Sequence, residues 1–253
     1  MKKSLLFSLV LLLLLAACGT GAAPSQGVQP APEGEGEKLT ARVLDDDGTD
    51  LLLAGLGEPF SGVYTVSRAD VAETGTDPDD LDPGRKAEFI FDGSVEESFP
   101  ARLGNLASAI PEADGRDCLV LLYLDVLEDL WEKDPALHDG IAKIGFDLSE
   151  TRLTSGERQA LGLMFAQSHG EAETVFGTWQ ELADRGLING EDLYWPDGVL
   201  LSVKEKTDAP GQVKFDAQMW RSGLGAYILC DCTSELRVGG EWTPYTVGSE
   251  AIS

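Results

Sequence analysis

Apolar and polar positions alternate over short distances between residues 38 and 111, which predicts a small domain made of strands. Two apolar runs, 39–44 and 51–54, flank the acidic turn Asp45-Asp-Asp-Gly-Thr-Asp50, a pattern typical of a β-hairpin. A second hairpin is expected around Asp92-Gly93. The other predicted strands are 63–66, 86–91 and 94–99. Several short strands with little helix favour a small barrel or a curled sheet.

Residues 114–253 show helical periodicity first and strand alternation afterwards. Apolar residues recur every three or four positions from Cys118 to Lys133, which predicts a helix with one buried face. Asp134-Pro135 ends this helix and predicts the start of a second one, with Pro135 at its first position. The capping boxes Thr154-Ser-Gly-Glu157 and Thr178-Trp-Gln-Glu181 predict the starts of two further helices. The strands expected after them are 213–220, 224–232, 241–247 and a hairpin formed by 193–195 and 199–203. Helices followed by an antiparallel sheet define the fold class as α+β.

The N-terminus has the pattern of a signal peptide. Lys2 and Lys3 precede the apolar run 5–17, in which only Ser8 is polar. A helix needs about 20 apolar residues to cross a bilayer, so this run is too short to span one, but it has the length of a signal-peptide core. Its end, Leu15-Ala-Ala-Cys18, resembles the lipobox of bacterial lipoproteins.

The lipobox resemblance implies that residues 1–17 are removed and that Cys18 carries a diacylglycerol at the new N-terminus. Two acyl chains anchor a protein stably, whereas one chain holds it only marginally. Residues 18–37 contain almost no large apolar side chain and are expected to form a disordered tether. The chain is therefore expected on the extracytoplasmic face of the cell membrane, with the lipid as its membrane contact.

The charge balance narrows the range of partners. The chain has 19 Lys and Arg against 44 Asp and Glu, a net charge of −25, and loss of Lys2 and Lys3 with the signal peptide leaves −27. Binding to nucleic acid depends on basic side chains that neutralise phosphates, so no nucleic acid is expected as a partner. Cationic partners suit the negative electrostatic potential of such a chain better, although a high negative charge also keeps a secreted protein soluble.

Three thiols remain beside the lipidated one, and the sequence leaves their pairing open. Cys230 and Cys232 lie two apart in a predicted strand, so both are expected on one face and too far apart for an easy mutual disulfide. The alternatives are a disulfide from Cys118 to one of them, a zinc site completed by His138 or His169, and three buried, unbonded cysteines. The last is favoured because free cysteine is among the most buried residue types.

A turn-rich loop offers candidate Ca²⁺ ligands, namely Asp77, Asp79, Asp80 and Asp82. The same composition is typical of a solvated turn. The sequence has no Cys-x-x-Cys or His-x-x-x-His spacing, and no metal or cofactor is otherwise expected.

No catalytic motif is present: Gly-x-Ser-x-Gly, His-Glu-x-x-His and a phosphate loop are all missing from the sequence. His138 and His169 are isolated candidates for a general base, and a position at a helix C-terminus also explains His169. Paired carboxylates leave a cell-envelope hydrolase as the alternative function. Tyr194 and Trp195 are candidate binding residues if they are exposed, whereas packing against a neighbouring helix is the other interpretation.

The segment Arg85–Leu103, with Phe91-Asp-Gly-Ser-Val-Glu-Glu-Ser-Phe-Pro100, resembles the small OB-like domain of cell-envelope lipoproteins from Gram-positive bacteria. Residues 215–227 and 248–253 are similar to other parts of the same group. The resemblance implies an OB-like β-domain over 38–111 and brings no activity with it. The expected function is a noncatalytic, membrane-anchored lipoprotein that binds an envelope protein, the cell wall or a small molecule.

Overall fold

The computed structural model describes residues 36–113, 115–170, 172–207 and 209–253. The signal peptide, Cys18 and almost the whole predicted tether lie outside these residues. Residues 36–253 form one compact unit. The strands and helices are, in chain order, β1 (Glu37–Asp46), β2 (Asp50–Gly55), β3 (Val63–Ser67), α1 (Arg68–Glu73), the 3-10 helix η1 (Pro78–Leu81), β4 (Lys86–Phe91), β5 (Ala101–Arg102), β6 (Leu106–Pro111), α2 (Leu119–Lys133), the 3-10 helix η2 (Pro135–Leu137), β7 (Lys143–Asp147), α3 (Ser155–Ser168), β8 (Glu173–Phe176), α4 (Trp179–Asp184), β9 (Gly198–Thr207), β10 (Gln212–Ser222), β11 (Gly225–Glu235) and β12 (Ser249–Ile252).

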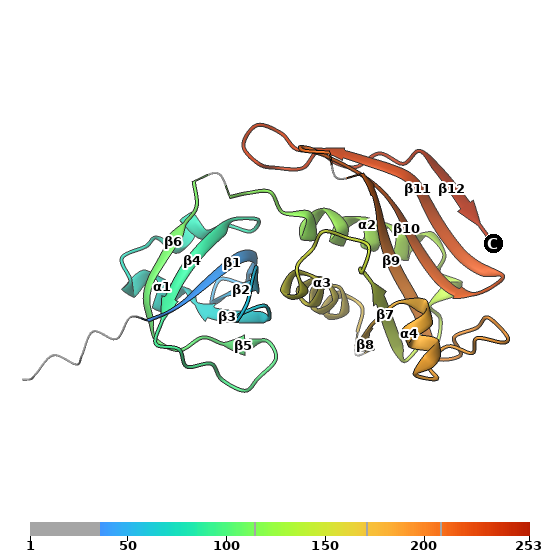
Figure 1. Cartoon of the computed structure of the whole chain (residues 1–253), viewed down its shortest axis with the longest axis horizontal. Helices are drawn as coiled ribbons and strands as arrows, with labels where there is room; N and C mark the ends of the chain where they lie inside the picture. The colour runs from blue at the N-terminus through green and yellow to red at the C-terminus, as the bar shows by residue number, and fades with distance from the viewer. Residues whose placement is uncertain (1–35, 114, 171, 208) are drawn as a thin grey trace, which may run out of the picture. The chain divides into compact units, whose positions relative to one another are not determined.

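The first sheet has the strand order β5-β3-β2-β1-β4-β6 (Figure 1). Its neighbours are antiparallel except for the pair β3–β5. The hairpin β1–β2 is confirmed, and its turn is fixed by the Asp47 carboxylate, which accepts the N–H groups of Thr49 and Asp50 at 2.7 and 2.8 Å. One face of the sheet packs under α1 and η1, which contribute the buried Val71 and Leu81.

The second predicted hairpin of this sheet is wrong, because β4 pairs with β6 rather than with residues 94–99. After β4 the Asp92 carboxylate accepts the N–H and hydroxyl of Ser94, at 2.9 and 2.6 Å, and the side-chain amide of Asn105 at 2.7 Å. These bonds turn the chain away from β4. Every residue from 94 to 99 is exposed, so no buried face sets a register for this segment as a strand.

The first sheet does not close into a barrel. A barrel joins every strand to two neighbours. In the part of the chain that the structure describes, β5 and β6 are the two ends of the sheet and do not pair with each other. The expected OB-like barrel is therefore not confirmed, whereas the broader α+β class is.

The second sheet has the order β12-β11-β10-β9-β7-β8 and is mixed. Strands β9 to β12 are antiparallel, but β7 runs parallel to both β8 and β9. The expected purely antiparallel sheet is wrong because the sequence pattern does not reveal β7 and β8, whose four or five residues are too few to show a period. The predicted hairpin across 193–203 is also wrong, since β9 pairs with β7 and β10.

The predicted strand at 241–247 is replaced by a looser segment along β11. Isolated bridges join Thr233 to Thr246 and Leu236 to Trp242, and β12 then takes the edge of the sheet. Pro244 has no N–H for a continuous ladder. The turn before this segment is confirmed, with Gly239 and Gly240 at φ values of 109° and 86°.

Three of the four helices predicted in the second region are confirmed, whereas the helix expected from Pro135 is only the short 3-10 helix η2. α2 buries the face that its periodicity predicts. α3 begins with a complete capping box, in which the Thr154 hydroxyl accepts the Glu157 N–H at 3.2 Å and the Glu157 carboxylate accepts the Thr154 N–H at 2.9 Å. Thr178 and Glu181 form the same pair of bonds at the start of α4.

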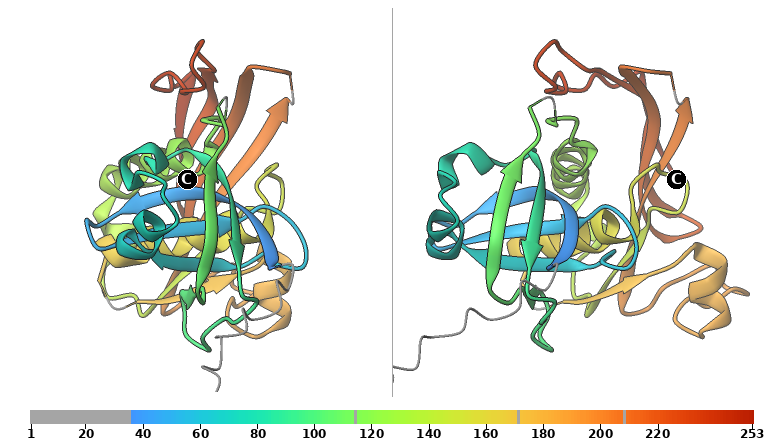
Figure 2. Two further views of the ribbon diagram at one scale, coloured as in Figure 1. Left: turned by 90° about the vertical axis from the view of Figure 1, so that its left-hand side faces the viewer. Right: turned by 60° about the vertical axis from the view of Figure 1, so that its left-hand side comes forward.

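Helices α2 and α3 pack on each other and lie between the two sheets (Figures 1 and 2). The start of α3 approaches the first sheet closely, since a Cβ on Gly156 would lie 2.6 Å from the Gly55 carbonyl oxygen and 2.7 Å from that of Gly62. The Thr154 hydroxyl donates to the Gly55 carbonyl at 3.2 Å. The first sheet also contributes three buried residues to the core around α2 and α3, namely Leu44, Ala54 and Val63.

A buried ion pair crosses the same contact. Arg42 Nε on β1 donates to Glu157 Oε1 at 3.0 Å, and the two side chains are only 12% and 8% exposed. Arg42 Nη1 donates to the carbonyls of Gly84 and Gly115 at 3.2 and 3.4 Å. One carboxylate therefore serves both the start of α3 and the attachment of the first sheet.

We expect Glu157→Gln to lower the free energy of unfolding by about 2–4 kcal/mol, because it leaves the Arg42 charge buried and unpaired. Urea denaturation followed by circular dichroism measures the change. The matched control is Glu181→Gln, which alters the same position of an exposed capping box and is expected to cost about 1 kcal/mol or less. Equal losses in the two variants would show that the ion pair has no role beyond capping.

Candidate functional site

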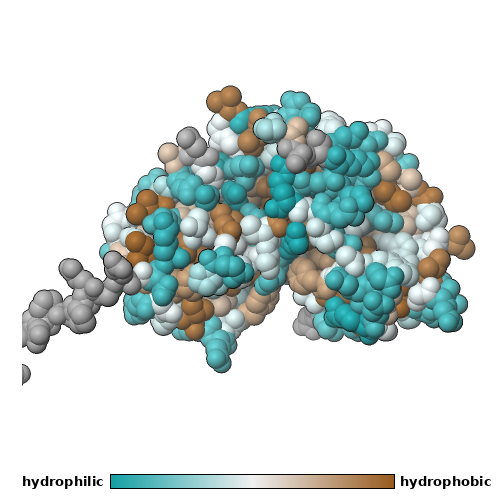
Figure 3. All heavy atoms as spheres, in the orientation of Figure 1, coloured by the Kyte–Doolittle hydropathy of each residue, from teal (hydrophilic) through white to brown (hydrophobic). Residues whose placement is uncertain are grey.

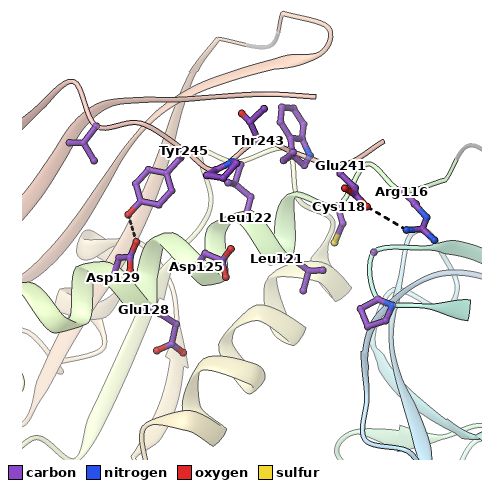
Figure 4. A pocket seen from close by; sticks show the side chains of 15 residues that line it. Arg116, Cys118, Leu121, Leu122, Asp125, Glu128, Asp129, Glu241, Thr243 and Tyr245 are labelled. Atoms are coloured by element: carbon purple, nitrogen blue, oxygen red, sulfur yellow. Dashed lines mark hydrogen bonds and ion pairs between the residues drawn. The ribbon is translucent and has the colours of Figure 1, made fainter. Parts of the chain in front are cut away.

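A groove of about 750 Å³ lies between α2 and the segment 241–247. Figure 4 shows Asp125, Glu128 and Asp129 projecting from α2, with Tyr245 on the opposite segment. Arg116 lies at one end, beside residues of the loop that precedes β4. The volume falls within the range of about 300–1,000 Å³ that is usual for small-molecule sites.

The α2 wall combines apolar and acidic side chains because two stripes of the helix meet there. Leu122 belongs to the buried stripe and is 6% exposed. Leu121, Asp125 and Glu128 follow at positions i, i+4 and i+7, which share one face of a helix, and Asp129 lies beside them. This wall therefore offers an apolar surface next to a row of carboxylates.

The opposite wall is held in place by hydrogen bonds at several points. Trp242 Nε1 donates to Asp117 Oδ1 at 2.9 Å, and the Tyr245 hydroxyl donates to Asp129 Oδ2 at 2.8 Å. The Ser234 hydroxyl donates to the Thr243 carbonyl at 2.7 Å. These bonds tie the segment 241–247 to α2 and to Asp117 just before it on one side, and to β11 on the other. The groove is therefore preformed.

The guanidinium of Arg116 at the end of the groove is already paired. It forms ion pairs with Asp82 and, at 3.6 Å, with Glu241. A Cβ on Gly240 would lie 2.9 Å from the Arg116 Cβ, so the glycine turn packs directly against this arginine. The described residues that line the groove supply four carboxylates against this one guanidinium, a formal charge of −3.

Partial burial and like charge act together on Asp125. The residue is exposed at its outer part, but partial desolvation raises its pKa, and the charges of Asp129 and Glu128 raise it further. Burial also raises the pKa of the Tyr245 hydroxyl, helped by its hydrogen bond to Asp129. Burial raises the pKa of Cys118 to about 11, so this thiol is protonated and unreactive at neutral pH.

The two histidines of the chain meet at a second cavity of about 500 Å³. His138 stacks on Trp131 with ring centroids 3.9 Å apart, and His169 lies 4.8 Å from the same indole. His138 Nε2 donates to the Trp131 carbonyl at 3.0 Å, and burial lowers its pKa. His169 Nε2 lies 2.5 Å from Glu128 Oε2, so Glu128 connects this cavity with the groove.

The four acidic candidates for calcium lie in or next to η1: Asp77, Asp79, Asp80 and Asp82. Asp77 caps η1 by accepting the Asp79 N–H at 3.1 Å. Asp79 pairs with Arg68, and Asp82 pairs with Arg116 at the groove. Across residues 36–253, apart from the three undescribed positions, no group of three or more His, Cys, Asp or Glu is arranged to hold a metal ion.

Trp195 is fully buried, which removes it as an exposed binding residue. Its ring fills the space left by two glycines, since a Cβ on Gly145 or Gly198 would approach it to 2.7 or 2.2 Å. Trp195 Nε1 donates to Asp197 Oδ1 at 3.1 Å. Tyr194 is 38% exposed and lies outside the groove lining.

The three cysteines of the described chain are free. The expectation that Cys230 and Cys232 share one face is wrong. A β-bulge shifts the register of β11 opposite residues 215–217, and Asp231 within it has a φ of 52°. Cys232 is therefore buried, whereas Cys230 is half-buried, and Cys118 lies at the start of α2.

No protein-family model matches the chain, and no curated protein is significantly similar to it. Among solved structures, the chain is similar to the NMR solution structure of residues 21–120 of YobA from Bacillus subtilis. The sequence identity is 18%, and the match covers 35% of this chain and 92% of that chain with a TM-score of 0.24. A TM-score this low carries no argument about fold or function.

We expect Asp125→Asn to raise the Tm at neutral pH and to have little effect near pH 4. The raised pKa means that the folded protein binds a proton more tightly than the unfolded chain, so stability is lost as pH rises through the window above about 3.9. Thermal unfolding at several pH values measures the effect. The control is Glu132→Gln, an acid on the same helix that does not line the groove. A Tm lowered by Asp125→Asn at pH 7 would contradict the expectation.

Proposed function

We propose that this chain is a lipid-anchored, noncatalytic binding protein on the extracytoplasmic face of a bacterial membrane, and that the groove along α2 is its ligand site. The observation that carries the binding role is the preformed groove of about 750 Å³ with one acidic and partly apolar wall. The support for the location is the Lys2 to Cys18 sequence pattern. No described helix is long and apolar enough to cross a membrane.

The rest of the visible surface offers less for recognition. Figure 3 shows mainly hydrophilic and neutral residues on one face, with hydrophobic residues in small groups. Scattered apolar residues are normal on a protein surface and do not mark an interface. The groove differs because its apolar and charged side chains converge on one open groove of the surface.

A hydrolase acting through paired carboxylates is the second candidate, and the raised pKa of Asp125 beside Asp129 favours it. Glycosidases place two carboxyl groups on either side of the scissile bond. Asp125, Glu128 and Asp129 instead project from the same helix (Figure 4). The facing Tyr245 is already bonded to Asp129, and Glu241 is bonded to Arg116. This one-sided arrangement suits binding better than hydrolysis.

The OB-like relationship of residues 38–111 belongs to this proposal as well. Its support is the resemblance of Arg85–Leu103 to the OB-like domains of Gram-positive envelope lipoproteins. OB-folds are five-stranded and only partly closed, so an open derivative with a sixth strand is a modest departure. Because fold does not fix function, the proposed ligand site rests on the groove alone.

The anchor is tested by Cys18→Ser. The variant should leave the membrane fraction, because the diacylglycerol can no longer be attached to the side chain. Membrane fractionation and mass spectrometry of the mature N-terminus measure this. Cys230→Ser is the matched control and should stay membrane-bound. An unmodified parent N-terminus, or a Cys18→Ser protein that stays in the membrane, would overturn the proposed location.

The groove is tested by photo-crosslinking in intact cells. We expect a benzoylphenylalanine introduced at Leu121, which lines the groove, to yield adducts of discrete mass. The control position is Glu97, which is exposed in the 94–99 segment and does not line the groove. Identical adducts at both positions, or none at Leu121, would count against the groove as the ligand site. Loss of wall-degrading activity in Asp125→Asn would favour the hydrolase instead.

A further inference from the structure

We propose that the groove takes an organic cation: an ammonium or guanidinium group held by the carboxylates of α2, carried on an apolar body that lies against Leu121 and Leu122. This inference deepens the proposed function, because it rests on the groove being the ligand site. The cation comes either from a small amine or from a basic side chain of a peptide.

The negative charge of the groove is not balanced by positive side chains among the described residues that line it. Its lining has a formal charge of −3, and its one guanidinium, on Arg116, is occupied by Asp82 and Glu241. Within the described residues, Asp125 forms neither an ion pair nor a side-chain hydrogen bond. Asp125 is exposed to solvent, and a bound cation would pair with it directly. Such charge-assisted bonds are about twice as strong as neutral ones.

The geometry of α2 places the cation near Asp125 and Asp129. These residues are four apart on one helix, so their Cβ atoms lie roughly 5–6 Å from each other, a spacing that one ammonium group spans. Asp129 accepts the Tyr245 hydroxyl through Oδ2, which leaves Oδ1 for a ligand. Glu128 is bonded to His169 and therefore contributes less.

The apolar part of the groove distinguishes an organic cation from a metal ion. Leu121, Leu122 and Pro244 line the same space as the carboxylates, and Trp242 and Tyr245 add aromatic rings. Ca²⁺ takes six to eight oxygen ligands and gains nothing from apolar walls. An ammonium or guanidinium group on a hydrocarbon body uses both surfaces, and aromatic faces attract such cations.

The test is calorimetric titration of the complete mature chain carrying Cys18→Ser with three probes of similar size. These are 4-phenylbutylamine, 4-phenylbutanol and 5-phenylpentanoate, which share the phenylbutyl body and differ in the charge of the group attached to it. We expect the amine to bind at least about tenfold more tightly than the alcohol, and the carboxylate most weakly. The preference for the amine should shrink at high salt, because ions screen exposed charges.

The variants locate the cation. Asp125→Asn should weaken the amine about tenfold while leaving the alcohol unchanged. Glu97→Gln removes an exposed acid outside the groove and should change neither. Capped tripeptides Leu-Lys-Leu and Leu-Gln-Leu form the second arm of the test. If the lysine peptide binds more tightly than the amine, the natural cation is a basic side chain of a polypeptide. If the amine binds more tightly, the natural cation is a small amine. Either order supports an organic cation.

The proposal of an organic cation would be overturned if the amine and the alcohol bound equally, or if Asp125→Asn left the affinity for the amine unchanged. In that case, discrete adducts at residue 121 in cells would still support the groove as the ligand site. Absence of both probe binding and such adducts would overturn the proposed function itself. The two failures therefore give different results.

Discussion

The buried pair of Arg42 and Glu157 connects the two sheets of the protein with the groove. Glu157 fixes the start of α3, and α3 packs against α2, whose other side forms the acidic wall. Arg42 also donates to the carbonyls of Gly84 and Gly115, which adjoin Arg116 at the end of the groove. Removal of either partner would leave an isolated charge away from water, so the pair acts as a single structural unit.

The local structure was largely predictable where short-range chemistry decides it. The buried face of α2, the two capping boxes and the β1–β2 turn all follow from side chains within a few residues of one another. The failures occurred where tertiary contacts decide. β7 is too short to show a clear period, and Gly145 within it disfavours a strand. Only the structure shows why a glycine is needed there: the ring of the buried Trp195 fills the space that a side chain would occupy.

The groove could not be predicted because its walls are far apart in the sequence. Asp125 and Tyr245 are separated by more than a hundred residues, and no local pattern shows that they meet. One signal was present: α2 carries Leu121, Asp125 and Glu128 on a second stripe beside its buried face. The meeting of His138 and His169 at Trp131 was equally hidden, since each histidine lies at the end of a different helical segment.

The position of Trp242 gives the groove an optical reporter of its own. Of the five indoles in the chain, it is the one that lines the groove, while Trp195 is sealed in the core and Trp131 lies against two imidazoles. Its N–H is held by Asp117, which fixes the orientation of the ring. Occupancy of the groove would therefore change the emission of Trp242, and Trp242→Phe would remove that change without a label being added.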